Sequence, residues 1–255
     1  MIISHLYKKF ISQLKEIYWF AASLLPVKAG GVILTYHSVA ENDSFFTVSP
    51  QTFEHQMDFL RKDRWNVVSL ETLVSMVIHN QEIPNKTVAI TFDDAYVDFL
   101  ECALPVLERY KIPVTVFVPT SLAGANMMSR DGVSLPILNW NQIKELAQHS
   151  LITIGSHTKT HPVLTSVVDP EKLHDELQGS KEEIELQLGV DCDFFAYPKG
   201  RSNSIVREEA GNIYRASVGT EYGRVREGQA DLSRLNRNGV YSYTSMSRFK
   251  CLLRK

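Results

Sequence analysis

Short apolar runs alternate with segments of helical periodicity along most of this 255-residue chain. The runs at 32–36, 67–70, 88–92, 113–118, 151–155 and 193–197 predict buried strands, and weaker runs at 216–218 and 232–235 predict two more. Helical spacing of apolar residues begins at residue 50 and recurs at 71–79, 97–110, 140–148 and 170–188. Repeated strand-then-helix units of this size favour an α/β fold with parallel strands and right-handed crossovers.

Two of the predicted helices have clear start signals. Ser49 precedes Pro50 and Asp169 precedes Pro170, so that each helix begins with a capping side chain and a proline in the first helical position. Gly189 is expected to end the second of these helices. The segment 124–136 has no apolar period and predicts an irregular loop over the mouth of the fold.

The first 29 residues form a separate amphipathic helical segment in this interpretation. Leu6, Phe10 and Leu14 lie at helical spacing, while the apolar stretch 17–25 is too short to cross a bilayer as a helix. Charged residues at positions 15 and 16 interrupt the pattern of a signal peptide. The helix is therefore expected either to pack on the rest of the protein or to make a peripheral contact with a membrane.

Composition narrows the possible classes of function. The 27 basic and 29 acidic residues give a net charge of -2 and form no long blocks, so no nucleic-acid partner is expected. Cys102, Cys192 and Cys251 lie far apart, which argues against a disulfide framework and against a cysteine zinc site. A reducing, cytoplasmic location is expected, with membrane association through residues 1–29 as an open alternative. The sequence predicts no oligomeric state.

Polar side chains directly follow two of the predicted strands. Asp93 and Asp94 come after the run 88–92, and His157 and His161 come after the run 151–155. Barrel enzymes carry their chemistry at the carboxyl ends of their strands. Adjacent carboxylates repel each other, and a bound cation offsets that repulsion. One carboxylate and two imidazoles are a sufficient ligand set for a catalytic divalent metal that keeps a position open for water.

The same ligand set is also typical of non-haem iron oxygenases, which leaves an oxygenase as a rival. The second aspartate distinguishes the two classes. A hydrolase needs a carboxylate beside the metal to accept a proton from water, whereas an oxygenase has no such need. With Asp94 as the ligand, Asp93 can take the role of base, so a metal-dependent hydrolase is favoured.

Three motifs, Thr-Phe-Asp-Asp at 91–94, His-Thr-Lys-Thr-His at 157–161 and Phe-Ala-Tyr-Pro-Lys-Gly at 195–200, appear in this order. Together they resemble the signature motifs of the polysaccharide deacetylase family, the NodB-homology or carbohydrate esterase family 4 group. The resemblance implies a distorted (β/α) barrel of about seven parallel strands. It also implies a divalent metal, with zinc expected, and hydrolysis of N-acetyl groups from amino sugars of a polysaccharide or lipid-linked glycan. Residues 30–255 would form this catalytic domain.

The resemblance also assigns roles at the matching positions. Asp93 is the expected general base, and the expected metal ligands are Asp94, His157 and His161. The family usually places a histidine near the end of the chain as general acid, yet no histidine follows position 174 here. His37, at the end of another predicted strand, is the expected replacement.

The third motif departs from the family pattern. The family often has an arginine there that orients the base, whereas Ala196 and Lys199 stand near that position in this chain. Arg237 is the expected replacement, ahead of Arg234, with surface positions for both as the alternative. The backbone amide of Lys199 is expected to donate to the oxyanion, because a main-chain donor does not depend on the side chain.

These departures leave alternative functions open. A non-catalytic descendant of the same fold would bind glycans without releasing an acyl group. A deformylase or an O-deacetylase would act on a related saccharide with the same set of residues.

Overall fold

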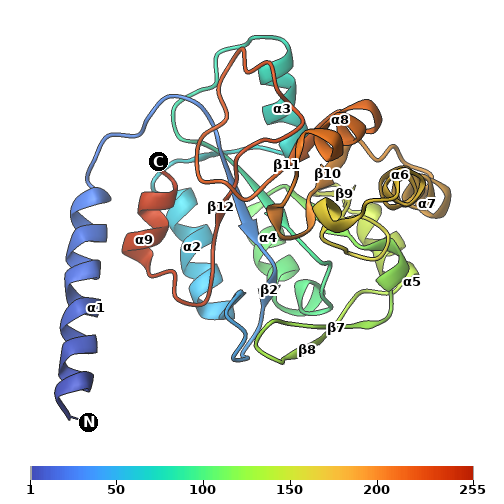
Figure 1. The fold of residues 1–255 in the computed structure, drawn as a ribbon. Helices are drawn as coiled ribbons and strands as arrows, with labels where there is room; N and C mark the ends of the chain where they lie inside the picture. Colours follow the sequence, from blue (N-terminus) through green and yellow to red (C-terminus); the bar gives the residue numbers. More distant parts are fainter. Residues whose placement is uncertain (1, 255) are drawn as a thin grey trace.

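A sheet of parallel strands forms the centre of the molecule, with helices around it (Figure 1). The computed structural model describes residues 2–254, and the side chains of residue 11 and of residues 13–254. The strand order is β11-β10-β9-β6-β5-β1-β12, and every neighbouring pair is parallel. These seven parallel strands form an α/β half-barrel, which confirms the distorted (β/α) barrel of about seven strands that the resemblance implies. The strands of this path are β1 (Val32–Tyr36), β5 (Thr87–Phe92), β6 (Val114–Val118), β9 (Ile152–Ser156), β10 (Phe194–Ala196), β11 (Ala216–Val218) and β12 (Asn238–Gly239).

The two edges of the sheet are joined by the chain that follows β11. Leu235 forms a single parallel bridge with Val218 in β11, and β12 then pairs with β1. The strand expected at 232–235 is therefore wrong: the Ser217 amide of β11 donates to the Leu232 carbonyl at 2.8 Å, but only Leu235 forms a bridge before the segment crosses to the other edge. An eighth strand, β4 (Asn66–Val67), pairs with the first residues of β5. Since β1 occupies one edge of β5, β4 and β6 share the other edge.

Most predicted helices form within one or two residues of their expected bounds. The α-helices after the first are α2 (Pro50–Lys62), α3 (Leu70–Ile78), α4 (Leu104–Tyr110), α5 (Trp140–Ala147), α6 (Pro170–His174), α7 (Ser180–Leu188), α8 (Ser204–Ile213) and α9 (Met246–Leu252). The segments expected as continuous helices at 97–110 and 170–188 each contain a π-helical turn. These turns are η1 (Phe99–Ala103) before α4 and η4 (Asp175–Gly179) between α6 and α7. Short 3₁₀ turns are η2 (Thr120–Leu122), η3 (Leu164–Ser166) and η5 (Pro198–Gly200).

The central strands are buried on both faces, as expected for a parallel sheet covered by helices. One face packs in a large cluster with residues of α2, α4, α5 and α7. Ile33 and Ala89, on the other face, belong to a second cluster with α3. Because side chains alternate along a strand, this second row continues at every other residue into His37 and Asp93. The pleat of the sheet therefore delivers these polar side chains to the same end of the barrel.

The segment expected to be irregular, 124–136, contains a short antiparallel pair, β7 (Asn126–Met128) with β8 (Ser134–Pro136). Gly132 has a φ of +82° and allows the turn between the strands, which the Ser129 amide closes by donating to the Val133 carbonyl. At the tip of the turn, Asp131 accepts a hydrogen bond from the Phe45 amide at 2.7 Å. This bond attaches the hairpin to the loop between β2 (Ser38–Val39) and β3 (Thr47–Val48).

The helix expected near the N-terminus is α1 (Ile2–Ala22), which lies beside the body next to α9 (Figure 1). The Ser245 hydroxyl donates to the Glu16 carboxylate at 2.9 Å, and the Arg254 guanidinium donates to the Leu25 carbonyl at 3.1 Å. Among residues 2–254, no helix combines the length and the apolar character needed to cross a bilayer.

Candidate active site

Two consecutive carboxylates end the central strand β5. The Asp93 amide still pairs with the Tyr36 carbonyl of β1 at 3.0 Å, and the chain then turns sharply. Asp94 and Ala95 have φ values of 71° and 51°, which place both in the left-handed region that side chains disfavour. Such strain tends to gather at functional sites. Here it lets the two neighbouring carboxylates contact different partners.

Asp93 forms a two-pronged ion pair with Arg237. Two guanidinium nitrogens of Arg237 donate to the two Asp93 oxygens at 2.7 and 2.8 Å, and the arginine is fully buried. Arg237 also donates to the Gly219 carbonyl at 2.7 Å and to the Thr91 hydroxyl at 3.1 Å. Burial raises the pKa of the Asp93 carboxyl, but the charge and hydrogen bonds of Arg237 outweigh burial and hold that pKa below its usual range. Asp93 is therefore ionised at neutral pH.

The choice between the two candidate arginines is clear from their contacts. Arg237 contacts Asp93, whereas Arg234 is paired with Glu221. The alternative in which both arginines are surface residues is wrong, since Arg237 is fully buried.

Asp94 faces the two histidines of the second motif. Its Oδ1 atom lies 3.5 Å from Nε2 of His157 and 3.4 Å from Nε2 of His161. One donor atom from each of these three residues lies within 4.8 Å of the others. The Oδ1 atom of Asp94 is buried and has no hydrogen-bond partner in the described chain.

The protonation of the histidines suits metal binding. Nδ1 of His157 lies 2.7 Å from the Ala196 carbonyl, and a carbonyl can only accept, so Nδ1 carries a proton and Nε2, which faces Asp94, is the nitrogen available to ligate a metal. Burial, followed by the neighbouring His157, lowers the pKa of His161 to about 4, so the His161 ring is neutral at pH 7. Three electron-pair donors thus converge on one point beside an unpartnered carboxylate oxygen, and a divalent cation fits this donor set.

His37 reaches the same site from the end of β1. Its Nε2 atom lies 4.0 Å from Oδ2 of Asp93, which is too far for a hydrogen bond, and its ring stacks on Phe46 with centroids 5.2 Å apart. The next residue, Ser38, donates to the Asp98 carboxylate at 2.6 Å, and the following amide donates to the same carboxylate at 3.2 Å. Asp98 thereby holds the chain that follows His37. Burial raises the pKa of Asp98 to about 6.

Lys199 lies in the tight turn η5, directly after the strand whose Ala196 carbonyl contacts His157. Its φ is 56°, its side chain is exposed, and within the described chain it forms no hydrogen bond or ion pair with the other candidate residues. The next residue, Gly200, has a φ of +67°, and a Cβ atom there would collide with the Thr220 side chain. The turn therefore requires glycine, and the predicted role of Lys199 rests on its backbone amide alone.

Glu176 supports the histidine motif and was not identified from the sequence. This buried side chain accepts hydrogen bonds from the amides of Lys159 and Thr160 at 3.0 and 2.9 Å and from the Thr160 hydroxyl at 2.5 Å. The Thr158 hydroxyl accepts from the His161 amide at 3.0 Å, and both Thr158 and His161 have positive φ. Glu176 lies in the π-helical turn η4, and such turns are frequent at functional sites. Helical periodicity alone gives no sign of that turn.

A row of aromatic rings beside His37 was also missed. Phe45 stacks on Tyr241 with centroids 6.1 Å apart, and Tyr241 stacks on Tyr243 at 5.4 Å. Phe45 and Tyr243 are 38% and 56% exposed, so the row is open to solvent. The sequence positions of these rings gave no signal, because two separate loops bring them together.

Two curated proteins are similar in sequence to large parts of this chain. The Bacillus subtilis protein YxkH, whose name assigns it to the polysaccharide deacetylases, is 29% identical over 199 residues, covering 77% of this chain and 67% of that protein. The poly-β-1,6-N-acetyl-D-glucosamine N-deacetylase of Escherichia coli K12 is 27% identical over 139 residues, which is 51% of this chain. That match covers only 20% of the E. coli protein, so this chain corresponds to about a fifth of it.

Solved structures share the fold. The Streptococcus pyogenes deacetylase PplD, solved in complex with acetate, matches with a TM-score of 0.75 and 27% identity over 91% of this chain and 100% of that chain. IcaB from Ammonifex degensii matches with a TM-score of 0.78 and 23% identity over 90% of this chain and 99% of that chain, which shows a common fold. The sequence model described as polysaccharide deacetylase matches residues 80–214, more than half of the chain. With that match around the Asp-Asp and His-x-x-x-His motifs, the chain belongs to the polysaccharide deacetylase family.

Proposed function

We propose that this protein is a metal-dependent N-deacetylase that acts on the amino sugars of a poly-N-acetylglucosamine type of polysaccharide. One observation carries the proposal. Three converging metal-ligand atoms, from Asp94, His157 and His161, lie beside a separate carboxylate, Asp93, that is fixed by Arg237. Relatives in E. coli and Staphylococcus epidermidis are named for deacetylation of poly-β-1,6-N-acetyl-D-glucosamine, which supports this substrate class. PplD was solved with acetate, the product of such a reaction.

Asp94, His157 and His161 would hold the cation, and two imidazoles with one carboxylate suit zinc. Bound there, the ion supplies Lewis-acid polarisation of the acetyl carbonyl and lowers the pKa of water. The Ala196 carbonyl orients the His157 ring for this task, because it fixes which nitrogen is free to ligate.

Asp93 would accept the proton of the water that attacks the acetyl carbon. The contacts of Arg237 keep the carboxylate ionised and oriented, while each oxygen retains a further lone pair for the proton. The Lys199 amide would donate to the oxyanion of the tetrahedral intermediate. As the carbon–nitrogen bond breaks, His37 would give a proton to the departing sugar amine, so that the products are acetate and a free amino sugar.

The row of rings at Phe45, Tyr241 and Tyr243 supports a saccharide substrate. Phe45 and Tyr243 are exposed, and Phe45 packs against Phe46, whose ring stacks on His37, so the row lies beside the site. Aromatic side chains combine such a face with a polar edge, which suits the mixed surface of a sugar ring.

Mass spectrometry of β-1,6-linked N-acetylglucosamine oligomers incubated with the protein tests the proposal. The expected result is the loss of acetyl groups, which stops when the metal is removed by a chelator and returns when zinc is added. Binding of the oligomer without acetyl release in the presence of zinc would indicate the glycan-binding alternative. Release of formyl or O-acetyl groups with the N-acetyl groups intact would indicate a deformylase or an O-deacetylase.

A further inference from the structure

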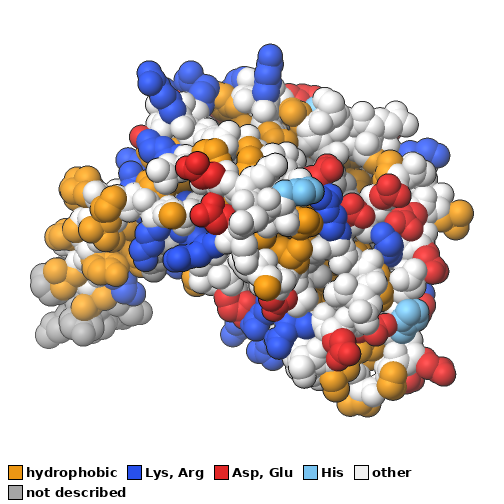
Figure 2. Space-filling view, turned by 90° about the horizontal axis from the view of Figure 1, so that it is seen from above, with side chains coloured by type: hydrophobic (Ala, Val, Ile, Leu, Met, Phe, Trp, Pro, Cys, Tyr) orange, Lys and Arg blue, Asp and Glu red, His pale blue; other side chains and the backbone are white. Residues whose placement is uncertain are grey.

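The outward face of the N-terminal helix is apolar. Six large apolar side chains between residues 14 and 25 are 46–71% exposed: Leu14, Ile17, Tyr18, Phe20, Leu24 and Leu25. They are six of the fifteen exposed large apolar side chains in the described part of the chain, although they lie within twelve residues. Figure 2 shows the apolar side chains gathered on this projecting helix. Surface helices normally turn their apolar side toward the core.

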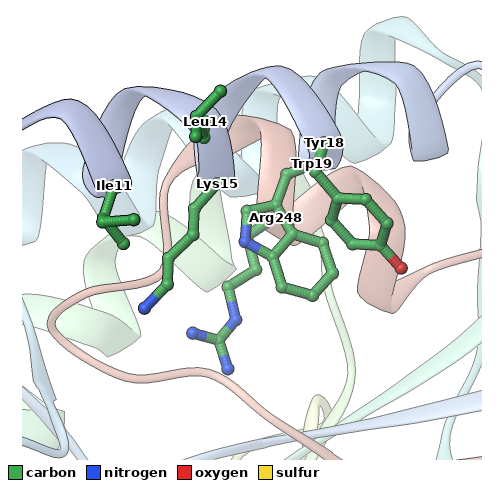
Figure 3. Close-up of a pocket in the computed structure, with 6 residues that line it drawn as sticks. All are labelled: Ile11, Leu14, Lys15, Tyr18, Trp19 and Arg248. Carbon is green, nitrogen blue, oxygen red and sulfur yellow. The ribbon is translucent and has the colours of Figure 1, made fainter.

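The inward face of α1 is already occupied. Arg248 of α9 lies between two rings, with its guanidinium 5.5 Å from the centre of Trp19 and 4.7 Å from the centre of Tyr243. In Figure 3, Lys15, Tyr18 and Trp19 extend from α1 toward Arg248, whereas Leu14, at the edge of the hollow that these residues line, points away from Arg248. A partner of α1 would therefore meet the apolar face. Leu14 and Ile17 are three positions apart and therefore lie next to each other on that face, while Tyr18 lies at its edge against Trp19, with ring centroids 5.0 Å apart.

Charge is unevenly distributed along the chain. Residues 1–29 contain four lysines and one glutamate, and residues 245–255 contain four basic residues and no acidic one. The two segments carry a net charge of +7 in a chain whose net charge is -2, so the remainder carries -9. Lys and Arg side chains lie near the junction of the projecting helix and the body (Figure 2). Basic residues beside an apolar helical face are typical of helices that bind anionic membranes.

We propose that α1, together with the chain through Lys28, lies on a lipid surface that contains anionic phospholipids. The apolar face would enter the boundary between headgroups and acyl chains, while the exposed Lys15, at the edge of that face, and the exposed Lys28, beyond the helix, would reach the phosphates. A second copy of the chain fits this face less well, because two copies would bring two segments of net positive charge together. The proposal is independent of the catalytic function.

Sedimentation with lipid vesicles tests the apolar part of this proposal. The variant Ile17→Gln/Leu24→Gln changes side chains that are 64% and 71% exposed, and Leu186→Gln/Ile205→Gln changes the same residue types at 84% and 66% exposure on α7 and α8. We expect the unchanged protein to bind vesicles of phosphatidylcholine mixed with phosphatidylglycerol. The first variant should bind at least about tenfold more weakly, and the second as well as the unchanged protein.

A second variant tests the attraction between the lysines and the anionic phospholipids. Lys15→Gln/Lys28→Gln should weaken binding to the mixed vesicles severalfold and leave any binding to pure phosphatidylcholine unchanged, and added salt should reduce the difference. Thermal unfolding of each variant checks that the fold is kept. Equal binding by the unchanged protein and by Ile17→Gln/Leu24→Gln, or no binding to the mixed vesicles, would overturn the proposal. A dimer in light scattering that Ile17→Gln/Leu24→Gln converts to a monomer, without vesicle binding, would assign the face to a second copy instead.

Discussion

Two neighbouring carboxylates at the end of β5 have opposite surroundings. On the arginine side of the site, both oxygens of Asp93 accept hydrogen bonds from the buried Arg237. On the histidine side, Asp94 faces the electron pairs of His157 and His161, and one of its oxygens has no hydrogen-bond partner in the described chain. The two carboxylates therefore have different tasks. Asp93, which has a positive partner within the protein, is held in place as a base, whereas Asp94, which faces electron-pair donors, requires a bound cation.

The largest effect is expected on the arginine side. Arg237→Met leaves the buried Asp93 without its positive partner, so the free energy of unfolding should fall by about 3–5 kcal/mol. Urea unfolding measures the change. The double variant Arg237→Met/Asp93→Asn should regain much of the loss, because the uncompensated charge is gone. Equal free energies of unfolding for the single and double variants would show that the unpaired charge of Asp93 is not the cause of the loss.

Asp93→Asn should reduce turnover by about a hundredfold or more, since an amide cannot accept the proton of water. The deacetylation rate of N-acetylglucosamine oligomers measures this loss. Asp191→Asn, which changes an exposed carboxylate, is the matched control and should keep full activity. Full activity in Asp93→Asn would remove Asp93 from the role of base.

Glu176→Gln tests the support of the histidine side. The amide group of glutamine places a donor where two backbone amides and a hydroxyl already donate, so we expect a loss of about 1–3 kcal/mol in the free energy of unfolding. Metal affinity should fall as well, because the turn that positions His161 is loosened. Glu182→Gln, an exposed position on α7, should change neither quantity. Unchanged metal affinity in Glu176→Gln would limit that residue to a role in stability.

The smallest expected effect concerns Asp98, beside His37. Burial raises its pKa to about 6 in the folded state, so the folded protein favours the neutral acid. That contribution to stability is fully present below the unfolded pKa of about 4 and is lost as the pH rises through about 6. Compared with Asp98→Asn, the protein should lose about 1–2 kcal/mol of unfolding free energy between about pH 5 and pH 7.5. A difference that does not depend on pH would contradict the assignment.

The parts of the site that follow strands could be predicted from the sequence. Asp93, Asp94 and His157 stand directly after apolar runs, and parallel strands bring such positions to one end of a barrel. His37 follows the same rule on β1. Arg237 was found through the family resemblance, since nothing local marks a residue 144 positions from its partner.

The rest depends on tertiary structure. Glu176 turns inward in the π-helical turn η4, which a regular helical period does not reveal. The chain after β11 was expected to form a strand at 232–235. It forms one bridge, at Leu235, and then the two-residue strand β12, because its path is set by the distance between β11 and β1. The aromatic row needs two loops that meet only in the folded chain.

Titration of chelator-treated protein with zinc, followed by calorimetry, tests the central claim about the two sides most directly. The account predicts one zinc ion per chain for the unchanged protein and for Asp93→Asn, with affinity weakened by about a hundredfold or more in Asp94→Asn. Zinc binding by Asp94→Asn that is as tight as in the unchanged protein would contradict it.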